Sequence, residues 1–149
     1  MSLGLYLHIP YCFSKCRYCD FYSHPGERGV PDAYVEALVR ELDRFAPERP
    51  LQPDTLYFGG GTPSLLRPEQ AKRLIDAARP LPGAEITLEA NPETVTEQSL
   101  AGFREAGVNR ISFGVQSARD TQLCTLGRPH TAKQARAACL LYTSPSPRD

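Results

Sequence analysis

Hydrophobic residues recur with two different periods along the chain, and segments of the two kinds alternate. Short apolar runs rich in strand-forming residues occupy 5–9, 55–58, 85–90 and 110–115. After each run, apolar residues recur every three or four positions, which is the spacing of one face of a helix. These amphipathic segments begin near residues 31, 68, 96 and 131. The pattern therefore predicts four strand–helix units in succession.

Start and stop signals support the predicted helices. Pro31 and Asp32 open the first helix, whose apolar positions are Tyr34, Leu38, Leu42 and Phe45. Pro68 opens the second, which carries Ala71, Leu74, Ile75 and Ala78 on one face. Thr96 is a suitable N-cap for the third and Gly107 a suitable C-terminal stop, with Leu100, Phe103 and Ala106 between them. A fourth helix is expected over residues 131–141.

Alternating strands and helices with short links are typical of βα units and of a parallel sheet. Such strands are joined by right-handed crossovers, so a full or partial barrel and a doubly wound sheet both fit. In either architecture, ligands bind at the carboxyl ends of the strands. The cysteine-rich, glycine-rich and polar segments of this chain directly follow predicted strands. We therefore expect these segments to meet at one edge of the sheet.

Composition narrows the class of protein. The chain has 149 residues, of which 41% are hydrophobic and 23% charged, as expected for one globular domain. Lys and Arg total 17 and so do Asp and Glu, so no bulk charge attracts nucleic acid. The chain has no run of about 18 apolar residues, the length needed to span a membrane, and its first residues lack a secretory signal. We expect a cytoplasmic protein with neither a transmembrane segment nor a nucleic-acid partner.

Three of the five cysteines lie on one short segment, Cys12-Phe13-Ser14-Lys15-Cys16-Arg17-Tyr18-Cys19. An odd number of cysteines in a reducing compartment argues against a disulfide framework. Three thiolates at this spacing can hold one [4Fe–4S] cluster and leave its fourth iron open. Structural zinc usually takes four protein ligands, which His8 or His24 could complete, so zinc stays the alternative. The two remaining cysteines, at 124 and 139, are expected in the core or on a helix face.

Further ligand-binding residues are predicted at the other strand ends. Gly60 and Gly61, within Gly59-Gly60-Gly61-Thr62-Pro63-Ser64, let the backbone approach a ligand and offer N–H groups; the alternative is a plain turn. Glu89 could accept hydrogen bonds from a ribose diol, or be an exposed charge. Gln116 and Arg128 could bind a ligand, the arginine in bidentate fashion, or be a surface amide and a surface cation.

The C-x3-C-x2-C spacing, with Tyr18 before the last cysteine, resembles the signature of the radical S-adenosylmethionine (SAM) superfamily. The sequence GGGTP at 59–63 resembles one branch, the oxygen-independent coproporphyrinogen oxidases and the HemW-type heme chaperones. The segments 107–117 and 126–130 are similar to the same branch. The resemblance extends over residues 3–141 in the correct order. It implies a partial TIM-like (β/α) barrel of the radical SAM type, with about four βα units.

The resemblance also implies cofactors and their ligands. Cys12, Cys16 and Cys19 would bind a [4Fe–4S] cluster, which in this superfamily reduces SAM to yield a 5′-deoxyadenosyl radical. Tyr6, Gly60 and Glu89 fall where the family binds its first SAM. A second set falls where the oxidases hold a second SAM, and it comprises Tyr18, Gly61, Thr62, Gln116 and Arg128.

One position favours the chaperones within this branch. The pattern that the resemblance gives for the oxidases is C-x3-C-x2-C-x-C, with a further cysteine two positions after the third. In this chain Phe21 occupies that position. The resemblance therefore implies a protein that binds heme and transfers it to acceptor proteins, with an electron donor for the cluster. The alternative is an oxygen-independent oxidase that decarboxylates coproporphyrinogen III.

The character of the chain changes abruptly at its end, over Leu141-Tyr142-Thr143-Ser144-Pro145-Ser146-Pro147-Arg148-Asp149. We expect residues 1–141 to be the N-terminal part of a radical SAM barrel domain. We interpret 142–149 as a disordered or non-native tail, and the chain as a fragment whose natural reading frame is interrupted near residue 140.

Overall fold

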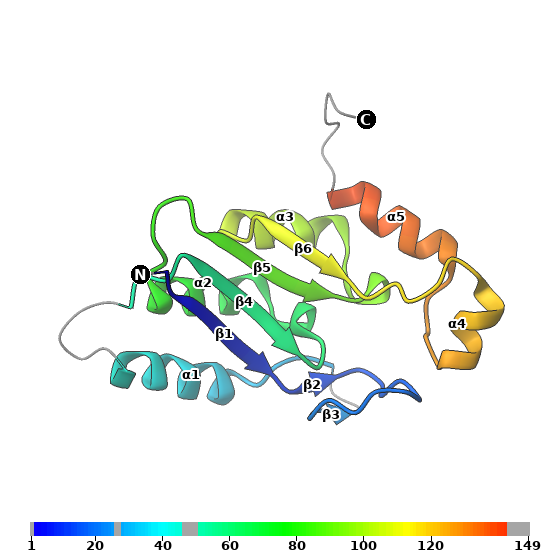
Figure 1. Cartoon of the computed structure of the whole chain (residues 1–149), viewed down its shortest axis with the longest axis horizontal. Helices are drawn as coiled ribbons and strands as arrows, with labels where there is room; N and C mark the ends of the chain where they lie inside the picture. The colour runs from blue at the N-terminus through cyan, green and yellow to red at the C-terminus, as the bar shows by residue number, and fades with distance from the viewer. Residues whose placement is uncertain (1, 26–27, 46–50, 143–149) are drawn as a thin grey trace.

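A computed structural model describes residues 2–25, 28–45 and 51–142. Its main sheet has the strand order β1-β4-β5-β6, and all three neighbouring pairs are parallel (Figure 1). The strands are β1 (Gly4–Ile9), β4 (Thr55–Gly60), β5 (Glu85–Ala90) and β6 (Arg110–Phe113). The helices are α1 (Asp32–Phe45), α2 (Pro68–Ala78), α3 (Glu97–Ala106), α4 (Asp120–Leu126) and α5 (Ala132–Tyr142). The predicted succession of strand–helix units is confirmed.

Alternation along each strand separates a buried face of the sheet from a more polar one. In β1, Leu7 and Ile9 are buried in one apolar cluster with Phe58 of β4 and Leu88 of β5. The same cluster includes residues of α1, α2 and α3, which lie side by side along that face (Figure 1). Tyr6, on the opposite face, is 53% exposed. The helices therefore leave the second face of the sheet to polar and aromatic side chains.

The predicted helix signals are confirmed at most positions. The hydroxyl oxygen of Thr96 accepts a hydrogen bond from the backbone N–H of Ser99 over 3.1 Å and caps α3. Gly107 ends α3 with a φ of 114°, which a glycine adopts without strain. The prediction that Phe45 lies on the buried face of α1 is wrong. Its side chain is 76% exposed at the last position of the helix, and Val35 is buried instead.

Two strand ends and one small sheet differ from the prediction. β4 continues to Gly60, whereas β6 ends at Phe113, where the N–H of Gly114 still bonds to the carbonyl of Ala90 over 2.9 Å. A two-stranded parallel sheet joins β2 (Tyr11–Cys12) to β3 (His24–Pro25). It holds together the two ends of the cysteine loop, which we define as residues 12–23.

Short 3-10 helices follow two of the strands, η1 (Pro63–Leu65) after β4 and η2 (Pro92–Thr94) after β5. Cys124 and Cys139 lie on α4 and α5 and are exposed, so they are helix-face thiols and not core residues. Of the predicted tail, Tyr142 is the last residue of α5, and 143–149 lie outside the described residues. Within the described ranges, no helix combines the length and apolar character needed to cross a bilayer.

Candidate functional site

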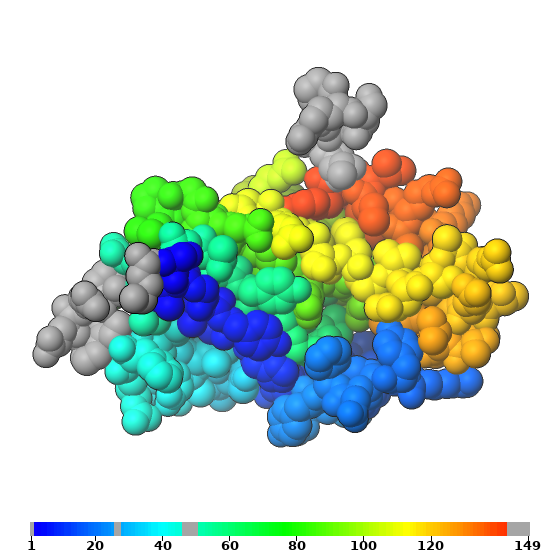
Figure 2. Space-filling view, in the orientation of Figure 1, coloured from blue at the N-terminus to red at the C-terminus, as the bar shows by residue number. Residues whose placement is uncertain are grey.

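The carboxyl ends of β4, β5 and β6 and the loops beside them surround a cavity of about 290 Å³. The cysteine loop forms one side of this cavity. The loop lies against the segment that contains α4 (Figure 2). The backbone N–H of Arg17 donates to the carbonyl of Leu126 across this contact over 3.2 Å. All of the predicted site residues except Tyr6 line the cavity, namely Cys12, Cys16, Tyr18, Cys19, Gly60, Gly61, Thr62, Glu89, Gln116 and Arg128.

The three clustered cysteines bring free thiols to this cavity. Cys12 ends β2 and is buried, whereas Cys16 and Cys19 are half-buried on the loop that follows. A turn joins the last two, since the N–H of Cys19 donates to the carbonyl of Cys16 over 3.1 Å. Polar groups approach two of the sulfurs, with Thr62 Oγ1 3.5 Å from Cys12 Sγ and Arg128 Nη1 3.1 Å from Cys16 Sγ.

This donor set fits an iron–sulfur cluster. In the described parts of the chain, no three His, Cys, Asp or Glu side chains are arranged to hold one metal ion. A cluster makes a different demand, because each thiolate binds its own iron and the ligands need only surround a shared volume. Three free thiols lining one cavity, two of them near hydrogen-bond donors, meet that demand.

The glycine segment after β4 packs directly against the cysteine loop. The N–H of Gly61 donates to the carbonyl of Ile9 over 2.8 Å, and that of Thr62 to the carbonyl of Tyr11 over 2.7 Å. A Cβ atom on Gly61 would lie 2.5 Å from the Tyr11 carbonyl oxygen and 3.0 Å from Cys12 Sγ. The Gly61 N–H is bonded within the protein, which differs from the expectation that it faces a ligand. The glycine is needed for close approach of the backbone.

Glu89 lies at the end of β5, where a tyrosine holds its carboxylate. The hydroxyl of Tyr57 donates to Glu89 Oε1 over 2.7 Å. Burial raises the pKa of Tyr57, and the hydrogen bond to the carboxylate raises it further because it favours the protonated phenol. One oxygen of Glu89 therefore has a fixed partner, while the side chain still lines the cavity.

Tyr6 lies beside the cavity and does not line it. Its ring stacks on that of Tyr57, with centroids 6.0 Å apart. Burial raises the pKa of the Tyr6 hydroxyl, and the nearby charge of Glu89 raises it further. The hydroxyl also lies 3.2 Å from Nδ1 of His8, whose Nε2 lies 3.1 Å from the carbonyl of Tyr22. His8 thus connects the Tyr6 hydroxyl to the backbone of the cysteine loop.

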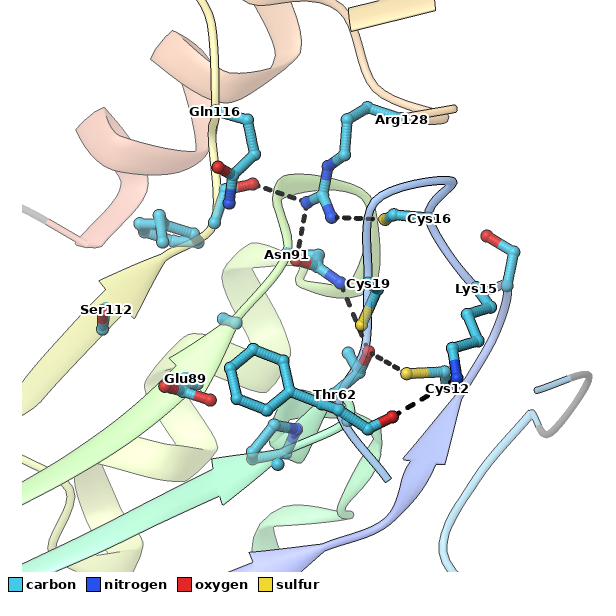
Figure 3. Close-up of a pocket in the computed structure, with 18 of the residues that line it drawn as sticks. Cys12, Lys15, Cys16, Cys19, Thr62, Glu89, Asn91, Ser112, Gln116 and Arg128 are labelled. Atoms are coloured by element: carbon cyan, nitrogen blue, oxygen red, sulfur yellow. Dashed lines mark hydrogen bonds between the residues drawn. The ribbon is translucent and has the colours of Figure 1, made fainter. Parts of the chain in front are cut away.

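Arg128 crosses the top of the cavity and links three segments (Figure 3). Its Nη2 donates to Asn91 Oδ1 over 2.6 Å and to the carbonyl of Gly114 over 2.5 Å, and its Nη1 donates to the Cys16 sulfur. Gln116 adopts a φ of 70°, in the left-handed region, and lines the cavity beside it. The predicted surface-cation alternative for Arg128 is wrong, since the residue is half-buried and both of its Nη atoms are bonded to groups of the cavity wall.

Sequence reasoning missed several residues of the cavity, of which Asn91 is the most connected. Its Nδ2 donates to Thr62 Oγ1 over 3.3 Å, and its Oδ1 accepts from Arg128. The available signal was its position, a polar residue directly after β5. Another missed lining residue is Ser112 of β6.

Comparisons with known proteins agree on one family. The model of the radical SAM superfamily matches residues 6–143. The heme chaperone HemW of Escherichia coli (strain K12) is 46% identical over 147 residues, which are 93% of this chain and 38% of that protein. HemW of Mycobacterium tuberculosis is 41% identical over 143 residues, covering 91% of this chain and 37% of the relative. The chain thus spans less than two fifths of the length of these curated relatives.

Solved structures confirm the fold. Coproporphyrinogen III oxidase (HemN) from Escherichia coli, a radical SAM enzyme, superposes with a TM-score of 0.84 at 29% identity, covering 95% of this chain and 34% of that one. The cobalamin-dependent SAM radical enzyme OxsB gives a TM-score of 0.61 at 18% identity, covering 95% of this chain and 22% of that one, and supports the fold alone. The predicted partial TIM-like barrel is therefore confirmed.

Proposed function

This chain belongs to the radical SAM superfamily, and we propose that the protein it comes from is a heme chaperone that binds heme and transfers it to target proteins. The observation that carries this proposal is the similarity to HemW proteins at up to 46% identity across nearly the whole chain. Phe21 supports this proposal. It lines the cavity, and it occupies the position at which the oxidase pattern has a further cysteine.

Cys12, Cys16 and Cys19 would hold a [4Fe–4S] cluster as thiolates. When bound, the cluster supplies an iron without a protein ligand and an electron for SAM. The protein contributes positive charge around the thiolates, since Lys15 and Arg128 both line the cavity. Positive groups near thiolates stabilise them over thiols and so favour their binding to iron.

Glu89 and Gly60 would contact SAM from the ends of β5 and β4. A carboxylate accepts hydrogen bonds from both hydroxyls of a ribose, and Glu89 keeps acceptor capacity beyond its bond to Tyr57. Tyr57 and the stacked Tyr6 would act on this carboxylate by limiting its rotation. Tyr6 is therefore proposed as a positioning residue and not as a direct contact.

The residues that the resemblance places at a second SAM line the same cavity, and we propose them as a second group of ligand contacts. Tyr18, Gly61 and Gln116 border the cavity directly. Thr62 and Arg128 are bonded to cysteine sulfurs, so a direct role in binding SAM requires these bonds to be exchanged or shared.

An oxygen-independent coproporphyrinogen III oxidase is the second candidate, favoured by the superposition on HemN with a TM-score of 0.84. Both candidates imply a cytoplasmic protein with SAM as a small-molecule partner. Both also imply a separate electron donor. They differ in cargo, since the chaperone binds heme and passes it to acceptor proteins, whereas the oxidase decarboxylates a porphyrinogen.

The test uses the protein at its full natural length, purified without oxygen and reconstituted with iron and sulfide. The chaperone proposal expects stable heme binding and transfer to a heme-free acceptor, without decarboxylation of coproporphyrinogen III. Decarboxylation without stable heme binding would establish the oxidase instead. Cys12→Ala, Cys16→Ala and Cys19→Ala should each lose the iron–sulfur absorbance, whereas the matched control Cys124→Ala, on the exposed face of α4, should retain it.

A further inference from the structure

We propose that Arg128, Asn91 and Thr62 form a directed hydrogen-bond chain that raises the reduction potential of the cluster. The inference rests on the cluster proposed above and adds a function for these three residues beyond contacts with SAM. The chain crosses the cavity from the segment after α4, past the end of β5, to the loop after β4 (Figure 3). It ends on the sulfur atoms of two of the three clustered cysteines.

The direction of the chain follows from its arginine. A guanidinium only donates hydrogen bonds, so the amide atom of Asn91 that faces Arg128 at 2.6 Å must be the oxygen. The amide nitrogen of Asn91 then faces Thr62 Oγ1 at 3.3 Å and donates to it. Because its oxygen accepts this bond, the Thr62 hydroxyl keeps its own proton for a bond to sulfur.

Each end of the chain places a donor on a different sulfur. Thr62 Oγ1 lies 3.5 Å from Cys12 Sγ, and both residues are buried, at 3% and 6% exposure. Arg128 Nη1 lies 3.1 Å from Cys16 Sγ. The Nε atom of Arg128 is also buried and has no hydrogen-bond partner among the described residues, so this part of the guanidinium is shielded from water. Hydrogen bonds are electrostatically stronger where water is excluded.

The sign of the effect follows from the charge on sulfur. Reduction adds an electron to the cluster and makes its thiolate ligands more negative. A donor to these sulfurs therefore stabilises the reduced state more than the oxidised one, and the potential rises. Asn91 contacts neither sulfur in this chain of bonds, so it acts as a positioning residue that orients the two donors.

The test compares Thr62→Val with Thr62→Ser in the reconstituted protein at full natural length, without SAM. Valine keeps the shape and removes the donor, whereas serine keeps the hydroxyl. Thr62→Val should shift the reduction equilibrium about tenfold toward the oxidised cluster, which is about 59 mV for one electron. Thr62→Ser should stay close to the unmodified protein. Because SAM is absent, loss of a contact with SAM cannot produce this difference.

Arg128→Met should lower the potential by a similar factor, and Arg17→Met is its control. Arg17 is an exposed guanidinium next to Cys16 in sequence, and its Nη1 bonds to the carbonyl of Thr125. Both variants remove one positive charge near the cluster, but only the first removes a bond to sulfur. Equal shifts of the reduction potential in the two variants would mean that Arg128 acts only through its charge. That result would overturn its part in the proposal.

Asn91→Leu tests positioning through a double-variant cycle. If Asn91 acts partly through Thr62, it should shift the potential less in a Thr62→Val background than in the unmodified protein. Full additivity would contradict the directed chain. A structural role unrelated to the sulfurs would not depend on the residue at 62.

A measurement on the unmodified protein keeps the proposal testable even if the variants fail to assemble a cluster. Exchange into deuterated buffer should shift the iron–thiolate stretching bands in resonance Raman spectra, since hydrogen-bonded sulfurs respond to deuterium. No shift, or identical potentials for the valine and serine variants at 62, would overturn the proposal. A protein that binds no iron or sulfide at all would instead refute the proposed cluster, so the two failures are distinguishable.

Discussion

Single residues at the carboxyl ends of the strands decide whether the cysteine loop can close on the cavity. The Cβ of Gly61→Ala would lie 2.5 Å from the Tyr11 carbonyl oxygen, a contact that only a backbone shift can relieve. We expect this variant to lose about 1–3 kcal/mol of unfolding free energy in urea titrations and part of its iron. Gly29→Ala is the control, since its Cβ would meet its nearest atom at 3.9 Å. Equal stability and iron content in the two variants would show that the close approach is unimportant.

Glu89 carries a second prediction of this kind. Glu89→Gln should weaken SAM binding to the reconstituted protein about tenfold, because a charged acceptor is worth about 1.4 kcal/mol more than a neutral one. Tyr57→Phe should weaken it less, since the carboxylate stays but loses its fixed partner. Anaerobic calorimetry measures both affinities. Glu85→Gln is the control on the same strand, where the carboxylate pairs with Arg110 at 3.2 Å. A similar loss there would contradict a specific role for Glu89.

The sequence and the structure agree best for residues whose chemistry depends on spacing alone. The cysteines and Gly61 were found because three thiols and a glycine triplet directly follow strands predicted from the sequence, where ligands bind. Asn91 was missed because its function comes from two partners that lie 29 and 37 residues away along the chain. Tyr6 was placed in the site by resemblance, yet its ring lies against Tyr57 outside the cavity lining.

Elements are tied to one another by buried polar groups as well as by the apolar core. Gln70 of α2 is 1% exposed and joins α2 to the start of α1. Its Nε2 donates to the carbonyl of Val30 over 2.8 Å and to Asp32 Oδ1 over 2.9 Å, and its Oε1 accepts from the N–H of Arg67. Gln70→Leu leaves the Val30 carbonyl without this donor. We expect a loss of about 2–3 kcal/mol of unfolding free energy in urea.

Lys72→Gln serves as the comparison on the same helix. Lys72 is 51% exposed and pairs with the exposed Asp76, so its replacement should change the unfolding free energy by less than about 0.5 kcal/mol. If Gln70→Leu cost no more than this, its buried hydrogen bonds would not be what couples the two helices.

The same contact gives a pH dependence. Hydrogen bonds from Gln70 and Arg67 lower the pKa of Asp32, so this carboxylate contributes stability when it is ionised in the folded state. That contribution is present above the ordinary pKa of an aspartate, about 4, and is lost as the pH falls through the lowered folded-state value. Asp32→Asn should therefore be less stable than the unmodified protein at neutral pH, and the gap should close below about pH 4. Urea titrations across this range measure it, and a gap that persists or widens in acid contradicts the assignment.

His130 joins two further elements around the site. It is buried at 3% exposure, with Nδ1 2.9 Å from Glu93 Oε2 in η2 and Nε2 3.1 Å from the carbonyl of Val115 after β6. The segment that carries Arg128 is thereby held to the ends of both β5 and β6.

The two-stranded β2–β3 sheet was not predicted from the sequence. Each of its strands has two residues, too short for any periodicity to show.

For the molecule as a whole, the hydrophobic pattern predicted the order of elements but not which of two architectures they form. A barrel and a doubly wound sheet share the same succession of strands and helices. The structure decides by position, because α1, α2 and α3 pack along one face of the sheet (Figure 1). A doubly wound sheet has helices on both faces. The uncovered face carries Tyr6, Tyr57 and Glu89, polar or aromatic residues that suit the interior of a barrel.

Ligands bound in the cavity should hold this architecture together. The cavity wall is built from the cysteine loop, the ends of β4, β5 and β6 and the segment after α4, so a bound group contacts several of these elements at once. A ligand that binds only the folded state stabilises it by about 2.7 kcal/mol at 100 times its dissociation constant. SAM at that excess should therefore raise the unfolding free energy of the cluster-loaded protein by about this amount. In Cys19→Ala, which should lack the cluster, SAM loses its attachment to iron, and the same concentration should give a much smaller rise. Anaerobic denaturant titrations with and without SAM measure both. Equal stabilisation of the two forms would mean that SAM binds independently of the thiolates, which contradicts the proposed site.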